Sequence, residues 1–262
     1  MKTLAELIEA IRNDRVNGAS TLTRQALEIL HLAACGLPSN SPDHYLTALT
    51  EVALELSQVR PNMHSINHYM QCFLAEIKQS PLTDDLPSYM VRLTEDLIQR
   101  WEVSRSQLIK AGASLIDQGN TIFTGSYSST IIASLLIASQ QGKDFSLLIA
   151  VSRLQDGQPA YGTNMARELA EQGITSTLIE DGKIADHAGK ADMVVLGADT
   201  VLADGSVING YPSMALAQAA SAYSIPVYVL CEVSKHSDRN TIQPEPGFDL
   251  IPPKLVTAVI TA

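Results

Sequence analysis

Residues 193–209 read MVVLGADTVLADGSVIN, and this stretch decides the fold. It begins with the apolar run 193–197, whose length and composition are typical of a strand buried on both faces. Asp199 follows closely, at the carboxyl end of that strand. The Asp-Gly pair at 204–205 lies between apolar residues, which predicts a hairpin turn that brings Asn209 back towards Asp199.

Similar apolar runs occur on both sides of this stretch and alternate with helical patterns. The predicted strands are 121–124, 146–151, 175–179, 193–197, 227–231 and 256–260, with helices near 128–141, 162–172, 183–189 and 211–223. This alternation predicts βαβ units and a parallel sheet, whereas the residues before 120 show only helical periodicity. The predicted fold class is α/β, with a helical N-terminal domain (1–118) followed by a Rossmann-like parallel-sheet domain (119–262).

The composition argues against two classes of partner. The chain has 262 residues, 45% of them hydrophobic, and a formal net charge of −10. Nucleic acids and anionic membranes need a basic protein face that neutralises phosphates, so neither is an expected partner. A small anionic ligand remains compatible with this charge, because a few well-placed cations and backbone N–H groups can bind it.

We expect the chain to be a cytoplasmic protein. Its three cysteines, Cys35, Cys72 and Cys231, form no CxxC motif, which is typical of reduced thiols. The first residues are charged and helical in pattern, unlike a signal peptide. No apolar run reaches the roughly 18 residues of a membrane-spanning helix.

Polar residues follow the predicted strands at their carboxyl ends. Ligands of open α/β sheets bind outside those ends, so we expect a polar crevice there for a small phosphorylated ligand. The candidate residues are Gly125, Ser126, Tyr127, Ser128, Arg153, Asp199, Asn209 and Lys235. Free N–H groups where a helix begins near Ser128 suit a phosphate, and plain N-capping by Ser128 is the alternative. Asp199 would act as a general base or bind ribose hydroxyls, with turn capping as the alternative.

No motif indicates a metal or an organic cofactor. The six histidines show no HExxH spacing, and His64 and His68, four residues apart, have no evident third ligand. The chain has neither GxGxxG nor GxxxxGK(S/T), so Rossmann dinucleotide binding and P-loop chemistry are not expected.

Several motifs, in order along nearly the whole chain, carry a family resemblance. They are residues 15–26 (RVNGASTLTRQA), 60–63 (RPNM), 152–153 (SR), 196–209 (LGADTVLADGSVIN) and 248–253 (FDLIPP). Together they resemble the translation initiation factor 2B superfamily, which comprises regulatory α, β and δ subunits and two sugar-phosphate isomerases. The isomerases act on methylthioribose 1-phosphate and ribose 1,5-bisphosphate. The resemblance implies a helical domain, a Rossmann-like domain, a ligand site between them and a homodimer.

The resemblance also implies roles for individual residues. Phosphate would be held by Arg15, Gly18, Ala19, Arg60 and Arg153, and the ribose by Asp199 and Asn209. The isomerases carry a catalytic Cys after the first strand, and Ser126 stands in its place here. This change is chemically large, because a thiol can ionise near neutral pH whereas a serine hydroxyl needs a strong base. Gly210 likewise stands where the family has Lys.

Three functions remain open. The first, favoured by Ser126, is a regulatory or non-catalytic protein that binds a phosphorylated sugar or nucleoside monophosphate without converting it. The second is an aldose–ketose sugar-phosphate isomerase in which Asp199 moves the proton and Ser126 hydrogen-bonds the substrate. The third is an interaction module with an empty crevice, which Gly210 allows and the retained Arg and Asp positions disfavour.

Overall fold

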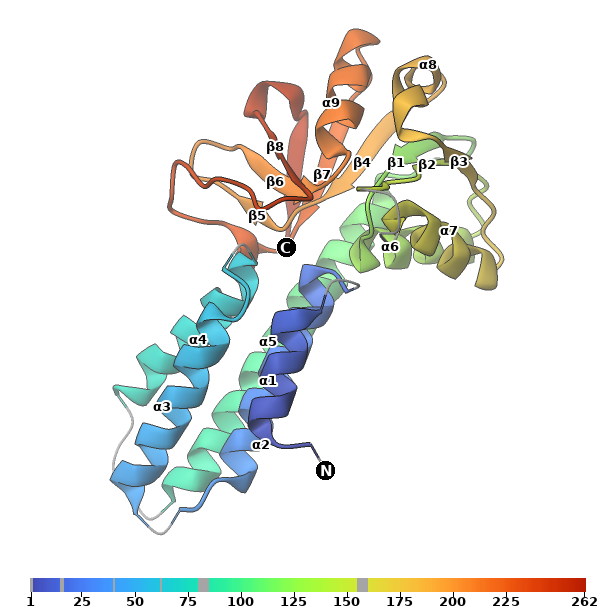
Figure 1. Cartoon of the computed structure of the whole chain (residues 1–262). Coiled ribbons are helices and arrows are strands. Elements are labelled where there is room, and N and C mark those ends of the chain that lie inside the picture. The colour runs from blue at the N-terminus through green and yellow to red at the C-terminus, as the bar shows by residue number, and fades with distance from the viewer. Residues whose placement is uncertain (1, 15–16, 40, 62, 80–84, 155–159) are drawn as a thin grey trace. The chain divides into compact units, whose positions relative to one another are not determined.

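The structure is a computed structural model that describes residues 2–14, 17–39, 41–61, 63–79, 85–154 and 160–262. The chain forms two compact units, Met1–Ser104 and Arg105–Ala262. We call them the helical unit and the sheet unit and describe each by itself. In Figure 1 the helical unit runs from blue towards green, and the sheet unit from green to red.

Amphipathic helices make up the helical unit. They are α1 (Leu4–Asn13), α2 (Ala19–Gly36), α3 (Pro42–Gln58), α4 (His64–Ile77) and the first part of α5 (Leu86–Ser114). Local signals set where they begin: Thr3 and Glu6 form a capping box at α1, and Ser41 caps α3. Their apolar faces form one core, whose completely buried side chains include Leu22, Leu30, Leu49, Leu56, Met70 and Phe73.

A six-stranded parallel sheet organises the sheet unit. Its strand order is β3-β2-β1-β4-β7-β9, and neighbouring strands pair in parallel. The strands are β1 (Thr121–Thr124), β2 (Ser146–Ala150), β3 (Thr177–Ile179), β4 (Met193–Gly197), β7 (Val227–Cys231) and β9 (Ala258–Thr261). The α-helices between them are α6 (Ser129–Gln140), α7 (Tyr161–Glu171), α8 (Ile184–Ala188) and α9 (Ser213–Ala222). The predicted fold class is confirmed.

The central strands are apolar on both faces because helices cover both. Ile122 and Val195 lie in one core together with residues of α6, α7 and the last part of α5. Their neighbours Phe123 and Leu196 lie in another core, together with residues of α8 and α9. Successive side chains of a strand point to opposite faces, so this alternation is what a doubly covered sheet requires. Figure 1 shows α6 and α7 on one side of the sheet and α8 and α9 on the other.

A small antiparallel sheet follows the end of β4. It contains β5 (Thr200–Val201), β6 (Val207–Gly210) and β8 (Phe248–Ile251), in the order β5-β6-β8. The predicted hairpin is confirmed, since β5 pairs with β6 and the Asp199 N–H donates to the Ile208 carbonyl at 2.8 Å. The pairing of β6 with β8 was not predicted, because β8 is short and comes much later in the chain.

Three predicted strands differ at their ends. β2 ends at Ala150 rather than at 151, and β3 begins at Thr177 rather than at 175. β9 begins at Ala258 rather than at 256 and ends at Thr261 rather than at 260. It begins later because the 3-10 turn Pro253–Leu255 precedes it and the Val256 N–H donates to the Pro253 carbonyl. These shifts leave the predicted succession of strands and their parallel pairing unchanged.

Among the described residues, no helix combines the length and the apolar character that crossing a bilayer requires. The two compact units divide inside α5. The domain boundary at residue 118 stays a prediction.

Candidate functional site

β1 and β4 are the central strands of the sheet, and the strands that follow them in the chain are added on opposite sides. On one side β1 is followed by β2 and β3, and on the other side β4 is followed by β7 and β9. Ligands of open α/β sheets bind at such a point, outside the carboxyl ends of the two central strands. The residues there are 125–128 after β1 and 198–199 after β4. This edge of the sheet is the candidate site.

Ser126 has an uncommon backbone conformation at this edge. Its φ is 63°, in the left-handed region that residues other than glycine rarely adopt. Its N–H donates to the Ser152 Oγ at 2.6 Å. Its hydroxyl lies against Gly210, since a Cβ at position 210 would overlap with the Ser126 Oγ. Ser126 is therefore held from two sides, by the residues that follow β2 and by the end of β6.

The turn between β1 and α6 packs against two other elements. A Cβ at position 125 would lie 2.8 Å from the Leu216 side chain of α9, so glycine fits there best. Ser128 caps α6, since its Oγ accepts from the Ile131 N–H at 3.4 Å. The capping role weighed for Ser128 is thus observed, and its side chain also lies next to Gly197 at the end of β4.

The phenol of Tyr127 contacts α7. Its hydroxyl donates to the Glu168 Oε2 at 2.8 Å. Burial, followed by this hydrogen bond, raises the pKa of Tyr127 to about 12. Tyr127 therefore stays protonated at neutral pH, and its proton is already donated to a carboxylate.

Asp181 binds the backbone amides that follow β2. Its Oδ1 accepts from the Ser152 N–H at 2.8 Å, and its Oδ2 accepts from the Arg153 N–H at 2.9 Å. Ser152 is also left-handed, with a φ of 59°, and its Oγ donates to the Ala150 carbonyl at 2.9 Å. A carboxylate thus occupies an N–H pair that could otherwise bind an anion. The side chain of Arg153 is exposed.

Charged side chains gather where β4 and β7 end. Lys235 and Glu232 are both buried, with the Lys235 Nζ 3.9 Å from the Glu232 Oε1. Burial raises the pKa of the Cys231 thiol to about 12, and the charges of Lys235, Glu232 and Asp199 also act on it. The structure therefore brings two predicted site residues, Asp199 and Lys235, close to one buried thiol.

Asn209 is buried on β6, and α9 orients it. Its Nδ2 donates to the Ser213 Oγ at 2.8 Å, and this hydroxyl donates to the Gly210 carbonyl at 2.6 Å. Its Oδ1 lies beside β4, because a Cβ at position 197 would be 3.5 Å from it. The hairpin thus returns Asn209 to the carboxyl end of β4, as the sequence predicts.

Two buried hydroxyls belong to strand ends on either side of β4. Thr124 ends β1 and Ser234 follows β7, and the strand order places β4 between them. Within the described part of the chain, neither the Thr124 Oγ1 nor the Ser234 Oγ has a hydrogen-bond partner. Buried polar groups are usually satisfied, so this edge suits a polar ligand or bound water.

The helical unit holds the remaining candidates. Arg60 donates through Nη1 to the Asp14 carbonyl at 2.5 Å, which brings it to the end of α1. Gly18 is the N-cap residue of α2, and Ala19 is the first residue of that helix. Arg15 lies outside the described residues. Within this unit, the structure brings Arg60 to the residue that begins the connection between α1 and α2.

Tyr211 and Asp249 were not predicted as site residues. Burial raises the pKa of Tyr211, and the charges of Asp181 and Asp249 raise it further. Burial also raises the pKa of Asp249, against the effect of the Met214 N–H, which donates to its Oδ2 at 2.9 Å. The 248–253 motif contained Asp249, but no pattern could bring Tyr211, Asp181 and Asp249 together, because they lie far apart in the sequence.

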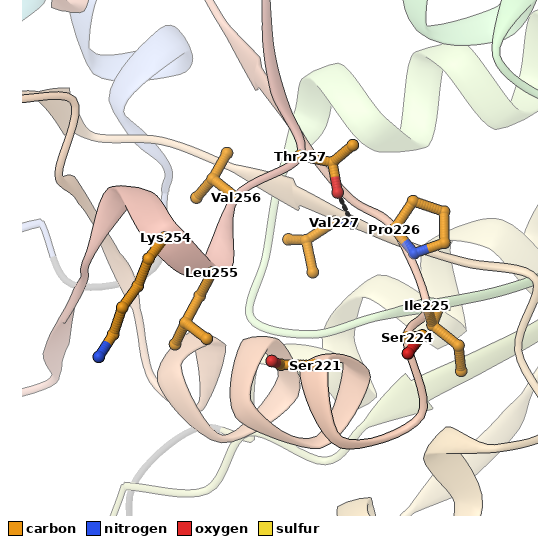
Figure 2. Close-up of a pocket in the computed structure, with 9 residues that line it drawn as sticks. All are labelled: Ser221, Ser224, Ile225, Pro226, Val227, Lys254, Leu255, Val256 and Thr257. Carbon is orange, nitrogen blue, oxygen red and sulfur yellow. Dashed lines mark hydrogen bonds between the residues drawn. The ribbon is translucent and has the colours of Figure 1, made fainter.

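We also considered metal-binding groups and pockets elsewhere in the structure as candidate sites. Among the residues that the structure describes, no group of three or more His, Cys, Asp or Glu could hold a metal ion. Figure 2 shows a pocket at the amino-terminal ends of β7 and β9, lined in part by Ser221, Ser224, Lys254 and Thr257. Ligands of parallel α/β sheets bind at the opposite ends of the strands, so we do not assign this pocket to the site.

Comparisons with known proteins agree with the fold. The sequence model of the Initiation factor 2 subunit family matches residues 15–245. A Pyrococcus furiosus protein named as translation initiation factor eIF-2B subunit 2-like is 28% identical over 239 residues, which cover 91% of this chain and 81% of the relative. A ribose 1,5-bisphosphate isomerase of Haloterrigena turkmenica is 26% identical in an alignment that covers 99% of this chain and 88% of the isomerase.

A solved structure supports the same relationship. The translation initiation factor eIF-2B of Pyrococcus horikoshii OT3 has a TM-score of 0.84 and 26% identity to this chain. The match covers 98% of this chain and 94% of that one. Proteins named as initiation factors and as isomerases are thus both similar to this chain over most of its length.

Proposed function

The chain belongs to the Initiation factor 2 subunit family, and on that premise we propose that it binds a phosphorylated sugar or nucleoside monophosphate without converting it. The ligand would lie at the carboxyl edge of the six-stranded sheet. Arg153 would contact the phosphate, Asp199 and Asn209 the ribose, and Ser126 a ring or hydroxyl oxygen. The chain would then be a regulatory or non-catalytic member of the family.

The main support for this proposal comes from the contacts of Ser126. A serine that attacks or transfers a proton needs an adjacent base within hydrogen-bond reach. The contacts described for Ser126 are a bond from its own N–H to Ser152 and the packing of its hydroxyl on Gly210. Neither neighbour is a base, so these contacts favour a serine that binds a ligand over one that is chemically activated.

The alternative is a sugar-phosphate isomerase, and Asp199 favours it. The half-buried Asp199 follows β4 at the point where the sheet reverses, and Asn209 lies beside the end of the same strand. A carboxylate so placed could move a proton between adjacent carbons of a sugar phosphate. Ser126 would then hydrogen-bond the substrate oxygen.

Other parts of the proposal rest on the resemblance and the composition. Arg15, Gly18, Ala19 and Arg60 would add phosphate contacts from the helical unit. A homodimer is expected from the family resemblance. The cytoplasm is the expected location, since three free cysteines suit a reducing compartment.

Thermal-shift measurements on the full chain test the proposal. The probes are ribose 1,5-bisphosphate, methylthioribose 1-phosphate and AMP, and a probe at 100 times its Kd adds about 2.7 kcal/mol of stability. We expect at least one probe to raise the melting temperature, and NMR of the same mixture to show that probe unchanged. A product signal would establish the isomerase instead. The absence of any shift across the probes would contradict ligand binding and favour the interaction module.

A further inference from the structure

One series of hydrogen bonds joins three strand ends of the candidate site. Asp181, after β3, accepts from the Ser152 and Arg153 N–H groups, after β2. Ser152 in turn accepts through its Oγ from the Ser126 N–H, after β1. Because β3, β2 and β1 are consecutive in the sheet, these bonds run along its edge from one strand to the next.

Ser126 and Ser152 need this support because both have a left-handed backbone. Their φ angles are 63° and 59°, a region that L-residues with a Cβ avoid. Such conformations persist where the surroundings enforce them, and they are common at ligand sites. The surroundings here are the two Asp181 oxygens, each of which accepts a charge-assisted bond from a backbone amide.

Ser152 links Asp181 to Ser126 through hydrogen bonds. The Ser152 side chain is completely buried, and its Oγ both accepts from Ser126 and donates to the Ala150 carbonyl. On the other side, the Ser126 hydroxyl packs on Gly210. Movement of the Ser152 backbone would therefore displace the Ser126 amide and, with it, the hydroxyl that faces Gly210.

We propose that Asp181 is a positioning residue of the candidate site, which holds Ser126 and Arg153 in place for an anionic sugar-phosphate ligand by acting through Ser152. This inference rests on the proposed function. Asp181 would not bind the phosphate itself, because both of its oxygens already accept backbone amides and because like charges repel. Its contribution is the geometry of two residues that would touch the ligand.

Asp181→Asn tests this role in the full chain. An asparagine has one side-chain oxygen and one NH2 group. It can therefore accept a hydrogen bond from only one of the two backbone N–H groups, and its NH2 group would face the other N–H as a second donor. We expect the Kd for whichever of the three probes the wild-type chain binds (ribose 1,5-bisphosphate, methylthioribose 1-phosphate or AMP), measured by calorimetry, to rise about 10-fold, in line with one lost charge-assisted bond. Asp186→Asn, at an exposed residue of α8, makes the same charge change and should leave the Kd unchanged.

A double-mutant cycle separates positioning from general structural damage. Ser152→Ala removes the acceptor of the Ser126 N–H, so the double variant with Asp181→Asn should bind about as weakly as the weaker single variant. Hydrogen exchange of the Ser126 amide should quicken in both single variants. Additive losses, or wild-type affinity in Asp181→Asn, would overturn the inference while the proposed function stands. A wild-type chain that binds none of the three probes would overturn the proposed function and the inference together.

Discussion

At the scale of single residues, the end of β7 combines charge with burial. The side chains of Lys235 and Glu232 are 7% and 1% exposed, and their charged atoms lie 3.9 Å apart. Burying a charge costs free energy unless an opposite charge or hydrogen bonds compensate it. Each charge therefore compensates part of the burial cost of the other, whatever either residue contributes to a ligand.

Lys235→Met should destabilise the chain by about 3 kcal/mol, because it leaves the Glu232 carboxylate buried without that ammonium group. The double variant Glu232→Gln with Lys235→Met should recover most of the loss, since neither buried charge is then present. Urea denaturation measures both effects. Lys254→Met, at an exposed residue, is the matched control and should change the midpoint little. Equal stability of the two lysine variants would contradict the dependence of Glu232 on Lys235.

At the scale of elements, the approach of α7 to β2 depends on one glycine. The Gly162 N–H donates to the Val151 carbonyl at 3.1 Å, which brings the first turn of α7 against the end of β2. A Cβ at position 162 would overlap with the Ala150 carbonyl oxygen. The obstacle is backbone, which cannot rotate away as a side chain could.

Gly162→Ala should therefore destabilise the chain by about 2–3 kcal/mol, as overpacking does where neighbours cannot yield. The measurement is the shift of the urea midpoint at constant slope. Gly182→Ala is the control, because nothing lies within 4 Å of a Cβ at position 182. If both alanine variants were equally stable, α7 could move away from β2 at no cost and the close approach would not matter.

At the scale of the whole molecule, α5 contributes to the cores of both units. Leu93, Leu97 and Trp101 lie in the core of the helical unit. Leu108 and Ile116, from the last part of α5 and the residues after it, lie in a core of the sheet unit with α6 and α7. The sheet unit thus includes residues that precede the predicted domain boundary at 118.

Two fragments test where the sheet unit begins. A fragment of residues 105–262 should unfold cooperatively, and one of residues 119–262 should be less stable by about 3 kcal/mol or more, since it lacks the buried Leu108 and Ile116. Urea denaturation followed by circular dichroism compares them. Equal stability would support the boundary at residue 118.

The sequence by itself determined the fold class, the succession of strands and helices, the hairpin before Asn209 and the strand ends where polar residues collect. These features follow from local periodicity and from the rule that parallel strands share one carboxyl edge. The rule on strand ends named Ser126 and Asp199 as site residues, and the Asp-Gly hairpin turn added Asn209. Their roles remain predictions.

Only the tertiary structure decided how the strand ends act on one another. It paired β6 with β8, placed the Ser126 hydroxyl on Gly210 and joined Asp181 to the amides that follow β2. Each of these contacts links residues far apart in the sequence. The periodicity of a single element carries no information about such pairs, because they form only when the sheet brings its strand ends to one edge.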